Sequence, residues 1–445
     1  MKLVVLGGGG FRVPLIHASL LDDPDRLVDE LVLHDVDESR LQAIVAVLDG
    51  QAAGRAWRPK LRVSTDLDTA LGGADIVFSA IRVGGLAGRT RDERVALEHG
   101  LLGQETVGVG GICYGLRTIP IALDIAERIR RLAPDAWLIN FTNPAGMVTE
   151  AVSAVLGDRV VGICDSPVGL CRRVAAALEV PYEQTWFDYV GLNHLGWLRG
   201  ALVHGKDRLP DLLTDDVALA SFEEGRLFGA SWLRTLGAIP NEYLHYYYFA
   251  RESVAQLENQ QDTRGEFLHR QQADFYARAT EQPAEALAQW QRTRAEREHT
   301  YLAEAREIAG AGERTACDVD GGGYERVAYD LMSAIVANRP STLILNVRNR
   351  SAVSTLDPNA IVELPCLVDG NGPRPIATGG LDGATAGLVQ QVKAVERTTI
   401  EAAVSRSRRT ALRALAEHPL VDSVAAAESA LDGYRAAFPE LADLR

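Results

Sequence analysis

The hydrophobic pattern of the first 165 residues predicts alternating strands and helices. Residues 121–128 predict a helix, and strands alternate with such helical stretches throughout this part. This alternation predicts a parallel sheet with helices on both faces. The fold class is therefore α/β, with an N-terminal Rossmann-like, doubly wound parallel sheet. The apolar runs that predict its strands are 2–6, 31–35, 74–80, 136–140 and 159–164.

The pattern changes after this part of the chain. Residues 186–198 predict a strand and a turn, and a long helical region covers roughly 265–311. Two later strands are expected at 343–347 and 361–365. Helices then run from about residue 386 to the end of the chain. The second part is therefore expected to be mixed α/β.

The first strand runs directly into four glycines, residues 7–10. Glycines after a strand let backbone amides approach a pyrophosphate, and a helix N-terminus completes the anion site. Gly7 and Gly9 match the first two glycines of the dinucleotide-binding pattern, whereas Arg12 stands at the third. An ordinary strand-to-helix turn is the alternative for this loop. Asp35 ends the second strand and could grip a ribose diol, which favours a nucleotide domain.

The length of 445 residues is too great for one small core and predicts two domains. We expect residues 1–165 to form the Rossmann-like, nucleotide-binding domain. Residues 166–445 are expected to form an α/β domain for substrate binding, catalysis and oligomerisation, packed tightly on the first. Ligands of parallel sheets bind at the carboxyl ends of the strands.

Composition and charge narrow the class of protein. A hydrophobic content of 47% and a charged content of 24% are those of an ordinary soluble enzyme. The net charge of −14 argues against a nucleic-acid-binding protein, although local arginines can still bind small anions. No stretch approaches the roughly 18 uninterrupted apolar residues of a membrane span, and the early first strand leaves no room for a signal peptide.

The cysteines indicate a reducing compartment. Their number is odd, and none forms a CxxC pair, so we expect mostly buried thiols. Together with the absence of a predicted membrane span, this favours a cytoplasmic protein without nucleic-acid or membrane partners. The five cysteines are Cys113, Cys164, Cys171, Cys317 and Cys366.

Polar side chains follow two of the predicted strands. Asn140 and Asn143 stand where an Asn-Pro pair favours a turn, and Asn143 either binds a ligand or caps the next helix. Cys164 and Asp165 place a thiol beside a carboxylate at the next strand end. A helix N-cap at Asp165 or Ser166, followed by Pro167, is the structural alternative, and it is compatible with a functional role.

Two further segments combine aromatic residues with groups that can do chemistry. His194 stands alone between glycines, and a core histidine is the more frequent case for such a residue. Paired with Cys164 and substrate oxygens, it would suit a borderline divalent ion such as Mn²⁺ or Fe²⁺. Residues 240–248, which include Tyr243, have the composition of an aromatic core strand, a more frequent case than a catalytic segment.

Arginines near glycines form the last group of candidate binding residues. Arg82 and Arg89 follow the third predicted strand, and Arg264 precedes the long helical region. The planar guanidinium binds phosphate through two parallel hydrogen bonds, so these residues are candidates for holding a phosphorylated substrate. Exposed salt bridges are the competing interpretation.

Together these segments resemble glycoside hydrolase family four, the NAD- and divalent-metal-dependent 6-phosphoglycosidases. The resemblance covers essentially the whole chain, and the ordered series of matches is specific although any one match is weak. Besides the glycine loop, the matching segments are 82–85, 103–106, 140–144, 164–167, 191–194, 240–244, 362–366 and 418–421.

The resemblance implies a set of site residues. In this set, Tyr243 is the base and Asp165 is the proton donor. The remaining residues bind a sugar 6-phosphate, NAD, and Mn²⁺ or another divalent metal. The implied NAD contacts are Gly7, Gly9, Gly10 and Asp35, the implied sugar-phosphate contacts are Arg89, Asn143 and Arg264, and the implied metal ligands are Cys164 and His194.

The resemblance also implies a reaction. Hydrolysis of 6-phospho-β-glucosides such as cellobiose 6-phosphate would proceed by NAD-dependent oxidation at C3, deprotonation at C2, elimination of the aglycone and addition of water. Ordinary glycosidases use two carboxylates, and no such pair is evident here. The substrate would be a phosphorylated disaccharide or an aryl glucoside, and the protein a homodimer or homotetramer.

Two departures bear on this assignment. Gly10 stands where the family usually has a serine, so a hydroxyl contact is lost. Asp165 follows the cysteine as in the 6-phospho-α-glucosidases, whereas segments 82–85, 246–248 and 418–421 look like the β-acting branch, which we favour. The alternatives are a 6-phospho-α-glucosidase, a lactate/malate-type NAD-dependent dehydrogenase and a non-enzymatic NAD sensor.

Overall fold

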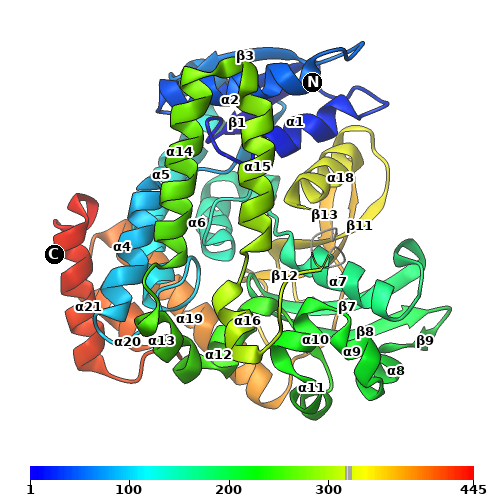
Figure 1. Cartoon of the computed structure of the whole chain (residues 1–445), viewed down its shortest axis with the longest axis vertical. Coiled ribbons are helices and arrows are strands. Elements are labelled where there is room, and N and C mark those ends of the chain that lie inside the picture. The colour runs from blue at the N-terminus through cyan, green and yellow to red at the C-terminus, as the bar shows by residue number, and fades with distance from the viewer. Residues whose placement is uncertain (316–317, 319–322) are drawn as a thin grey trace.

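The computed structural model describes residues 1–315, 318 and 323–445 (Figure 1). Its first six strands pair in parallel in the spatial order β3-β2-β1-β4-β5-β6. This is the strand order of a Rossmann sheet, and it confirms the predicted fold class. The elements of this part are β1 (Lys2–Leu6), α1 (Val13–Leu21), β2 (Glu30–His34), α2 (Glu38–Ala52), β3 (Lys60–Ser64), α3 (Leu67–Leu71), β4 (Ile76–Ser79), α4 (Gly85–Leu97), α5 (Gly108–Leu132), β5 (Trp137–Asn140), α6 (Ala145–Leu156) and β6 (Val160–Gly162).

The remaining strands extend the same sheet. Beyond β6 the order continues β11-β12-β7-β8-β10, and these pairs are antiparallel. The sheet therefore crosses the boundary predicted after residue 165, which stays a prediction. The strands are β7 (Thr185–Leu192), β8 (Leu195–Val203), β9 (Lys206–Asp207), β10 (Ile239–Pro240), β11 (Ser341–Arg348), β12 (Ile361–Asp369) and β13 (Gly372–Pro375).

Helices cover this second part of the chain. Figure 1 shows α14 and α15 side by side, with one end close to α2 and the other toward α13 and α16. The helices are α7 (Ser166–Ala177), α8 (Leu209–Thr214), α9 (Asp216–Ala220), α10 (Glu223–Phe228), α11 (Ala230–Leu236), α12 (His245–Tyr248), α13 (Ala250–Asn259), α14 (Arg264–Glu281), α15 (Ala286–His299), α16 (Ala303–Ala309), α18 (Tyr324–Val336), α19 (Gly383–Ser405), α20 (Arg408–Ala416) and α21 (Val424–Ala437).

The aromatic segment 240–248 is not the core strand that its composition favours. Only its first residue pairs, in β10, and the chain then forms a single 3-10 turn followed by the short helix α12. Asn241 begins this turn, because its side chain accepts a hydrogen bond of 3.1 Å from the backbone N–H of Tyr243. The helical winding places Glu242, Tyr243 and Tyr246 on the wall of one cavity.

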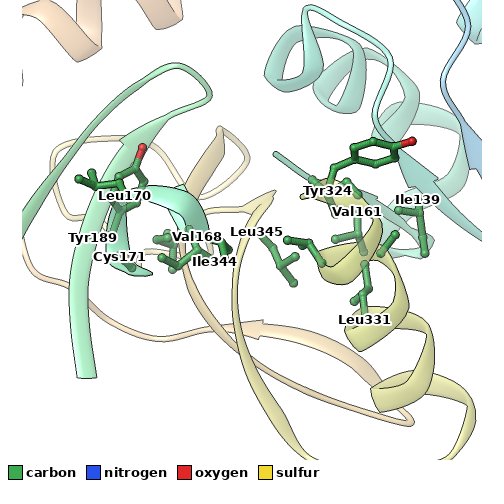
Figure 2. Close-up of a cluster of buried hydrophobic side chains, with 14 of the residues drawn as sticks. Ile139, Val161, Val168, Leu170, Cys171, Tyr189, Tyr324, Leu331, Ile344 and Leu345 are labelled. Atoms are coloured by element: carbon green, nitrogen blue, oxygen red, sulfur yellow. The ribbon is translucent and has the colours of Figure 1, made fainter. Parts of the chain in front are cut away.

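One hydrophobic core joins the parallel and antiparallel halves of the sheet. Figure 2 shows Ile139 and Val161, from β5 and β6, close to Leu331 of α18, with Leu345 of β11 nearby. All four residues are fully buried. Burial of each contributes about 2 kcal/mol to folding, so the two halves stabilise one another.

The long helix α5 is apolar because it is buried in the core of the fold. By length and composition it is the one helix among the described residues that could cross a membrane, but 78% of its most apolar window is buried inside the fold. Helix α5 is therefore a core helix. The cysteines at 113, 164, 171 and 366 are buried and unpaired, as predicted, and Cys317 lies outside the described residues.

The start of α5 packs closely on the loop before it. A Cβ on Gly111 would lie 2.5 Å from the carbonyl carbon of Thr106, which is a backbone atom and cannot move aside. We expect Gly111→Ala to lower the free energy of unfolding by about 1–3 kcal/mol. Gly387→Ala, in open space on α19, is the control and should raise this free energy by up to about 1 kcal/mol. Equal urea-denaturation curves for the two variants would contradict this account of the packing.

Candidate active site

A cavity of about 800 Å³ opens at the carboxyl ends of the parallel strands and is walled by residues from both parts of the chain. Gly9 does not line it, because its backbone N–H turns to the Asp35 carboxylate at 3.0 Å. The structure therefore brings together ten of the eleven predicted site residues. Those ten are Gly7, Gly10, Asp35, Arg89, Asn143, Cys164, Asp165, His194, Tyr243 and Arg264.

The glycine loop needs its glycines for close backbone contacts. Gly7 has a φ of +79°, in the left-handed region, and its carbonyl accepts the Gly10 N–H at 2.8 Å. A Cβ on Gly10 would lie 2.8 Å from the same carbonyl oxygen. Glycine at this position, where the resembling family has serine, therefore matches the tight turn of this loop.

Two helices of the second part hold the same loop. Tyr276 of α14 donates from its hydroxyl to the Gly9 carbonyl at 2.7 Å, and the Trp290 indole N–H of α15 donates to the Phe11 carbonyl at 2.8 Å. Arg40 Nε also donates to the Gly9 carbonyl, at 3.4 Å, so the buried carbonyls of this loop have hydrogen-bond partners. The dinucleotide loop is therefore fixed by residues far away in the sequence.

Cys164 and His194 meet at the cavity wall. Cys164 follows β6, and His194 stands in the tight turn between β7 and β8 with a φ of +61°. The Cys164 Sγ and His194 Nε2 atoms are 3.4 Å apart. Burial lowers the pKa of His194 to about 4, so its ring is neutral and can act as a ligand. Burial, with Glu363 and Asp165 nearby, raises the pKa of the Cys164 thiol well above its ordinary value.

This pair fits the divalent metal that the resemblance implies. The two atoms are close enough to share one ion, and a thiolate with an imidazole suits a borderline cation. Among the described residues, no group of three or more histidine, cysteine, aspartate or glutamate side chains could hold a metal. A bound sugar would add oxygen ligands to this pair.

Tyr243 lies directly on the ring of His194. The two rings stack with their centroids 3.7 Å apart and their planes within 9°. The Tyr243 hydroxyl accepts a hydrogen bond from the Tyr301 hydroxyl at 3.2 Å. Burial and the carboxylate of Glu242 raise the pKa of Tyr243, which keeps the hydroxyl protonated unless a cation is close.

Asp165 faces the cavity as a partly exposed carboxylate. Asp165 does stand at the N-cap position of α7, but its side chain makes no capping bond and is free to face the cavity. It lies 4.0 Å from the Cys164 Sγ and 3.5 Å from a guanidinium nitrogen of Arg12. Asn143 accepts the Ala145 N–H at 3.3 Å and still lines the cavity, so local turn formation and ligand binding are compatible.

Nine arginines line the cavity, and five of them lie close enough together for their charges to interact. Arg89 is only 7% exposed, which argues against the surface salt bridge considered from the sequence. It pairs with Glu93 at 2.8 Å and with Glu105 at 2.9 Å. Arg82 also pairs with Glu105. The five arginines, here called the arginine cluster, are Arg12, Arg82, Arg89, Arg264 and Arg297.

Two members of the arginine cluster have no carboxylate partner within the described part of the chain. Arg264 donates to the Thr300 hydroxyl at 2.7 Å and to the Arg297 carbonyl at 3.0 Å. Burial and the cation of Arg89 lower the pKa of Arg264 to about 10. Burial and the neighbouring guanidiniums lower the pKa of Arg297 well below its ordinary value. Crowded, buried cations favour a bound anion, which offsets their repulsion.

Comparison with known proteins identifies the chain. Residues 2–180 match the model of "Family 4 glycosyl hydrolase", and residues 189–421 match that of the "Family 4 glycosyl hydrolase C-terminal domain". The chain belongs to glycosyl hydrolase family 4. This confirms the resemblance inferred from the motifs and makes the protein an enzyme of the glycoside hydrolase class.

Relatives with both anomeric specificities in their names match the family 4 chain. A Bacillus subtilis (strain 168) protein named "Probable 6-phospho-beta-glucosidase" is 33% identical over 446 residues, covering 97% of this chain and 95% of the relative. A 6-phospho-alpha-glucosidase from Leptotrichia buccalis is 31% identical over 449 residues, covering 97% and 96%. The 6-phospho-beta-glucosidase structure from Thermotoga maritima with manganese, NAD+ and glucose-6-phosphate has a TM-score of 0.83 at 27% identity, covering 99% of both chains.

Sequence reasoning missed several residues of this family 4 site. Arg297 and Tyr301 come from a charged helical region, and no motif in their local sequence marks them. Thr106 belongs to a matching segment but received no role, although its hydroxyl lies 2.5 Å from the His194 Nδ1. Only the tertiary structure shows that these side chains belong to the site.

The arginine cluster generates a test by substitution. Arg297→Gln removes one crowded cation, so the protein should unfold at an equal or higher temperature without anions. Loss of a charge-assisted hydrogen bond worth about 1.5–3 kcal/mol should weaken inorganic phosphate binding roughly 10–100-fold. Thermal unfolding at increasing phosphate concentration measures both effects.

Arg292→Gln is the matched control, because Arg292 is exposed on the same helix. It should show the phosphate stabilisation of the unmodified enzyme. A phosphate response of Arg297→Gln that equals this control would remove Arg297 from the anion site.

Proposed function

We propose that this family 4 enzyme hydrolyses 6-phospho-β-glucosides with NAD⁺ and a divalent metal. Its coarser activity is that of a 6-phosphoglucosidase, the activity named for its relatives of both branches. The observation that carries the proposal is the Cys164–His194 pair with Tyr243 stacked on it, in one cavity with the arginine cluster. The β preference is supported by the segments 82–85, 246–248 and 418–421.

The cavity offers a place for each ligand. Gly7, Gly10 and Asp35 would hold NAD, and Cys164 and His194 would hold the metal. Relatives of this chain have been solved with NAD and manganese. When bound, NAD supplies a hydride acceptor and the metal supplies a Lewis acid for the sugar oxygens.

The residues of the chain have separate tasks in this proposal. Arg89, Arg264 and Arg297 bind the 6-phosphate, and Asn143 helps to hold the sugar in the cavity. Tyr243 removes the proton from C2 of the oxidised sugar, and Asp165 gives a proton to the departing aglycone oxygen. Because the C2 proton is acidified by the neighbouring ketone, no second catalytic carboxylate is required.

The proposal includes the substrate, the cellular location and the oligomeric state of the enzyme. We propose a phosphorylated disaccharide or aryl glucoside as substrate, a cytoplasmic location and a homodimeric or homotetrameric state. Size-exclusion chromatography with light scattering tests the oligomeric state, and a monomer at assay concentration would contradict it.

Release of p-nitrophenol from the α- and β-linked 6-phosphoglucosides tests the function directly. We expect release from the β-linked compound, with a requirement for both NAD⁺ and Mn²⁺ and without accumulation of NADH. Faster release from the α-linked compound would transfer the enzyme to the other branch. Stoichiometric NADH formation with hydroxy acids would instead support the dehydrogenase alternative.

The assigned base can be tested by removing one oxygen atom. Tyr243→Phe keeps the ring that stacks on His194 but cannot accept the C2 proton. We expect turnover to fall about 10²–10⁴-fold, with Mn²⁺ and NAD⁺ binding unchanged by calorimetry. Tyr182→Phe, which alters a tyrosine stacked on Phe187 away from the cavity, is the control. Normal turnover by Tyr243→Phe would rule out this base.

A further inference from the structure

The loop between α4 and α5 contacts both the arginine cluster and the metal-site histidine. Glu105 pairs with Arg82 and Arg89 through its two carboxylate oxygens. The next residue, Thr106, has its hydroxyl 2.5 Å from the Nδ1 atom of His194. Two adjacent side chains therefore connect the proposed phosphate site to the proposed metal site.

We propose that Thr106 positions His194 for the metal and that Glu105 makes metal affinity depend on an anion at the arginine cluster. This inference rests on the metal and phosphate sites of the proposed function. It assigns roles to two residues that have none in the reaction itself. Thr106 is a positioning residue, because it acts through His194, and Glu105 couples the two binding sites.

The role of Thr106 follows from the geometry of the imidazole. The Nε2 atom of His194 faces the Cys164 Sγ at 3.4 Å, so it is the nitrogen that would bind the metal and must carry no proton. The proton of the neutral ring is then on Nδ1, which donates to the Thr106 hydroxyl. Outer partners of this kind fix the tautomer and the ring orientation of metal-binding histidines.

The backbone around Thr106 supports this role. Gly111 brings the first turn of α5 so close that a side chain there would touch the Thr106 carbonyl carbon. The Thr106 hydroxyl is therefore presented by a backbone that is packed on α5. A fixed acceptor orients the ring more strongly than a flexible side chain or water would.

The role of Glu105 follows from competition for guanidinium groups. Its carboxylate is 16% exposed and pairs with both Arg82 and Arg89, so it occupies donors that a phosphate would use. A phosphate that takes these donors leaves the Glu105 charge without its partners, next to Thr106. This negative charge then attracts a cation at the Cys164–His194 pair, in addition to the direct attraction between phosphate and metal.

Binding of Mn²⁺ alone tests the positioning role by titration calorimetry. Thr106→Val removes the acceptor at nearly constant volume and should raise the Mn²⁺ dissociation constant about 10–100-fold. Thr106→Ser keeps the hydroxyl and should bind Mn²⁺ like the unmodified enzyme. An unchanged dissociation constant for Thr106→Val in a folded protein would overturn the role, as would an equal loss in Thr106→Ser.

Linkage between inorganic phosphate and Mn²⁺ tests the coupling role. Saturating phosphate should tighten Mn²⁺ binding to the unmodified enzyme, and Mn²⁺ should tighten phosphate binding by the same factor. In Glu105→Gln this factor should fall at least threefold, because only the direct attraction remains. Glu98→Gln, an exposed charge change at the end of α4, is the control and should keep the full factor.

The outcomes separate this inference from the proposed function. Equal coupling factors in Glu105→Gln and Glu98→Gln would overturn the coupling role, whatever the turnover. Intact coupling in an enzyme that releases no p-nitrophenol would leave this inference standing and refute the proposed reaction. Absence of both Mn²⁺ and phosphate binding in the unmodified enzyme would refute both.

Discussion

The contact between Cys164 and His194 depends on a sheet that changes from parallel to antiparallel without interruption. Strands β11 and β12 lie between β6, which precedes the cysteine, and β7, which precedes the histidine. Gly162 of β6 pairs with Asn346 of β11, and a Cβ on this glycine would lie 2.8 Å from the asparagine Cβ. Close packing at this junction brings the two strand ends over one cavity.

A buried carboxylate stabilises the same junction. Glu363 of β12 accepts hydrogen bonds from Asn346 at 2.7 Å, from Asn193 at 3.3 Å and from the Tyr189 hydroxyl at 3.1 Å. Burial raises the pKa of Glu363 to about 7, despite these three donors. Since Asn193 directly precedes His194, the carboxylate fixes the turn that carries the histidine. The cost of burying this polar group is offset by hydrogen bonds that define the site.

Elements that are set by local sequence patterns were predictable, whereas elements that are set by tertiary contacts were not. The buried strands β1, β2 and β4 follow from apolar runs, whereas β3 escaped detection because its five residues are exposed or half-buried. Segment 240–248 was wrong as a strand, because the Asn241 turn and the surrounding cavity override its aromatic composition. Motif matches identified both Cys164 and His194 from the sequence. Arg297 was identified only from the structure, because the packing of α15 places it in the arginine cluster.

The charge states of the cavity explain why two oppositely charged ligands belong together in it. Burial keeps the Cys164 thiol and the Tyr243 hydroxyl protonated and the His194 ring neutral. The groups assigned to metal binding and proton removal are therefore uncharged, while the arginine cluster carries excess positive charge. A phosphate alone satisfies the arginines, and a cation alone draws protons from the thiol and the phenol. Because these two requirements meet in one cavity, a phosphorylated sugar that also offers oxygens to a metal satisfies both at once.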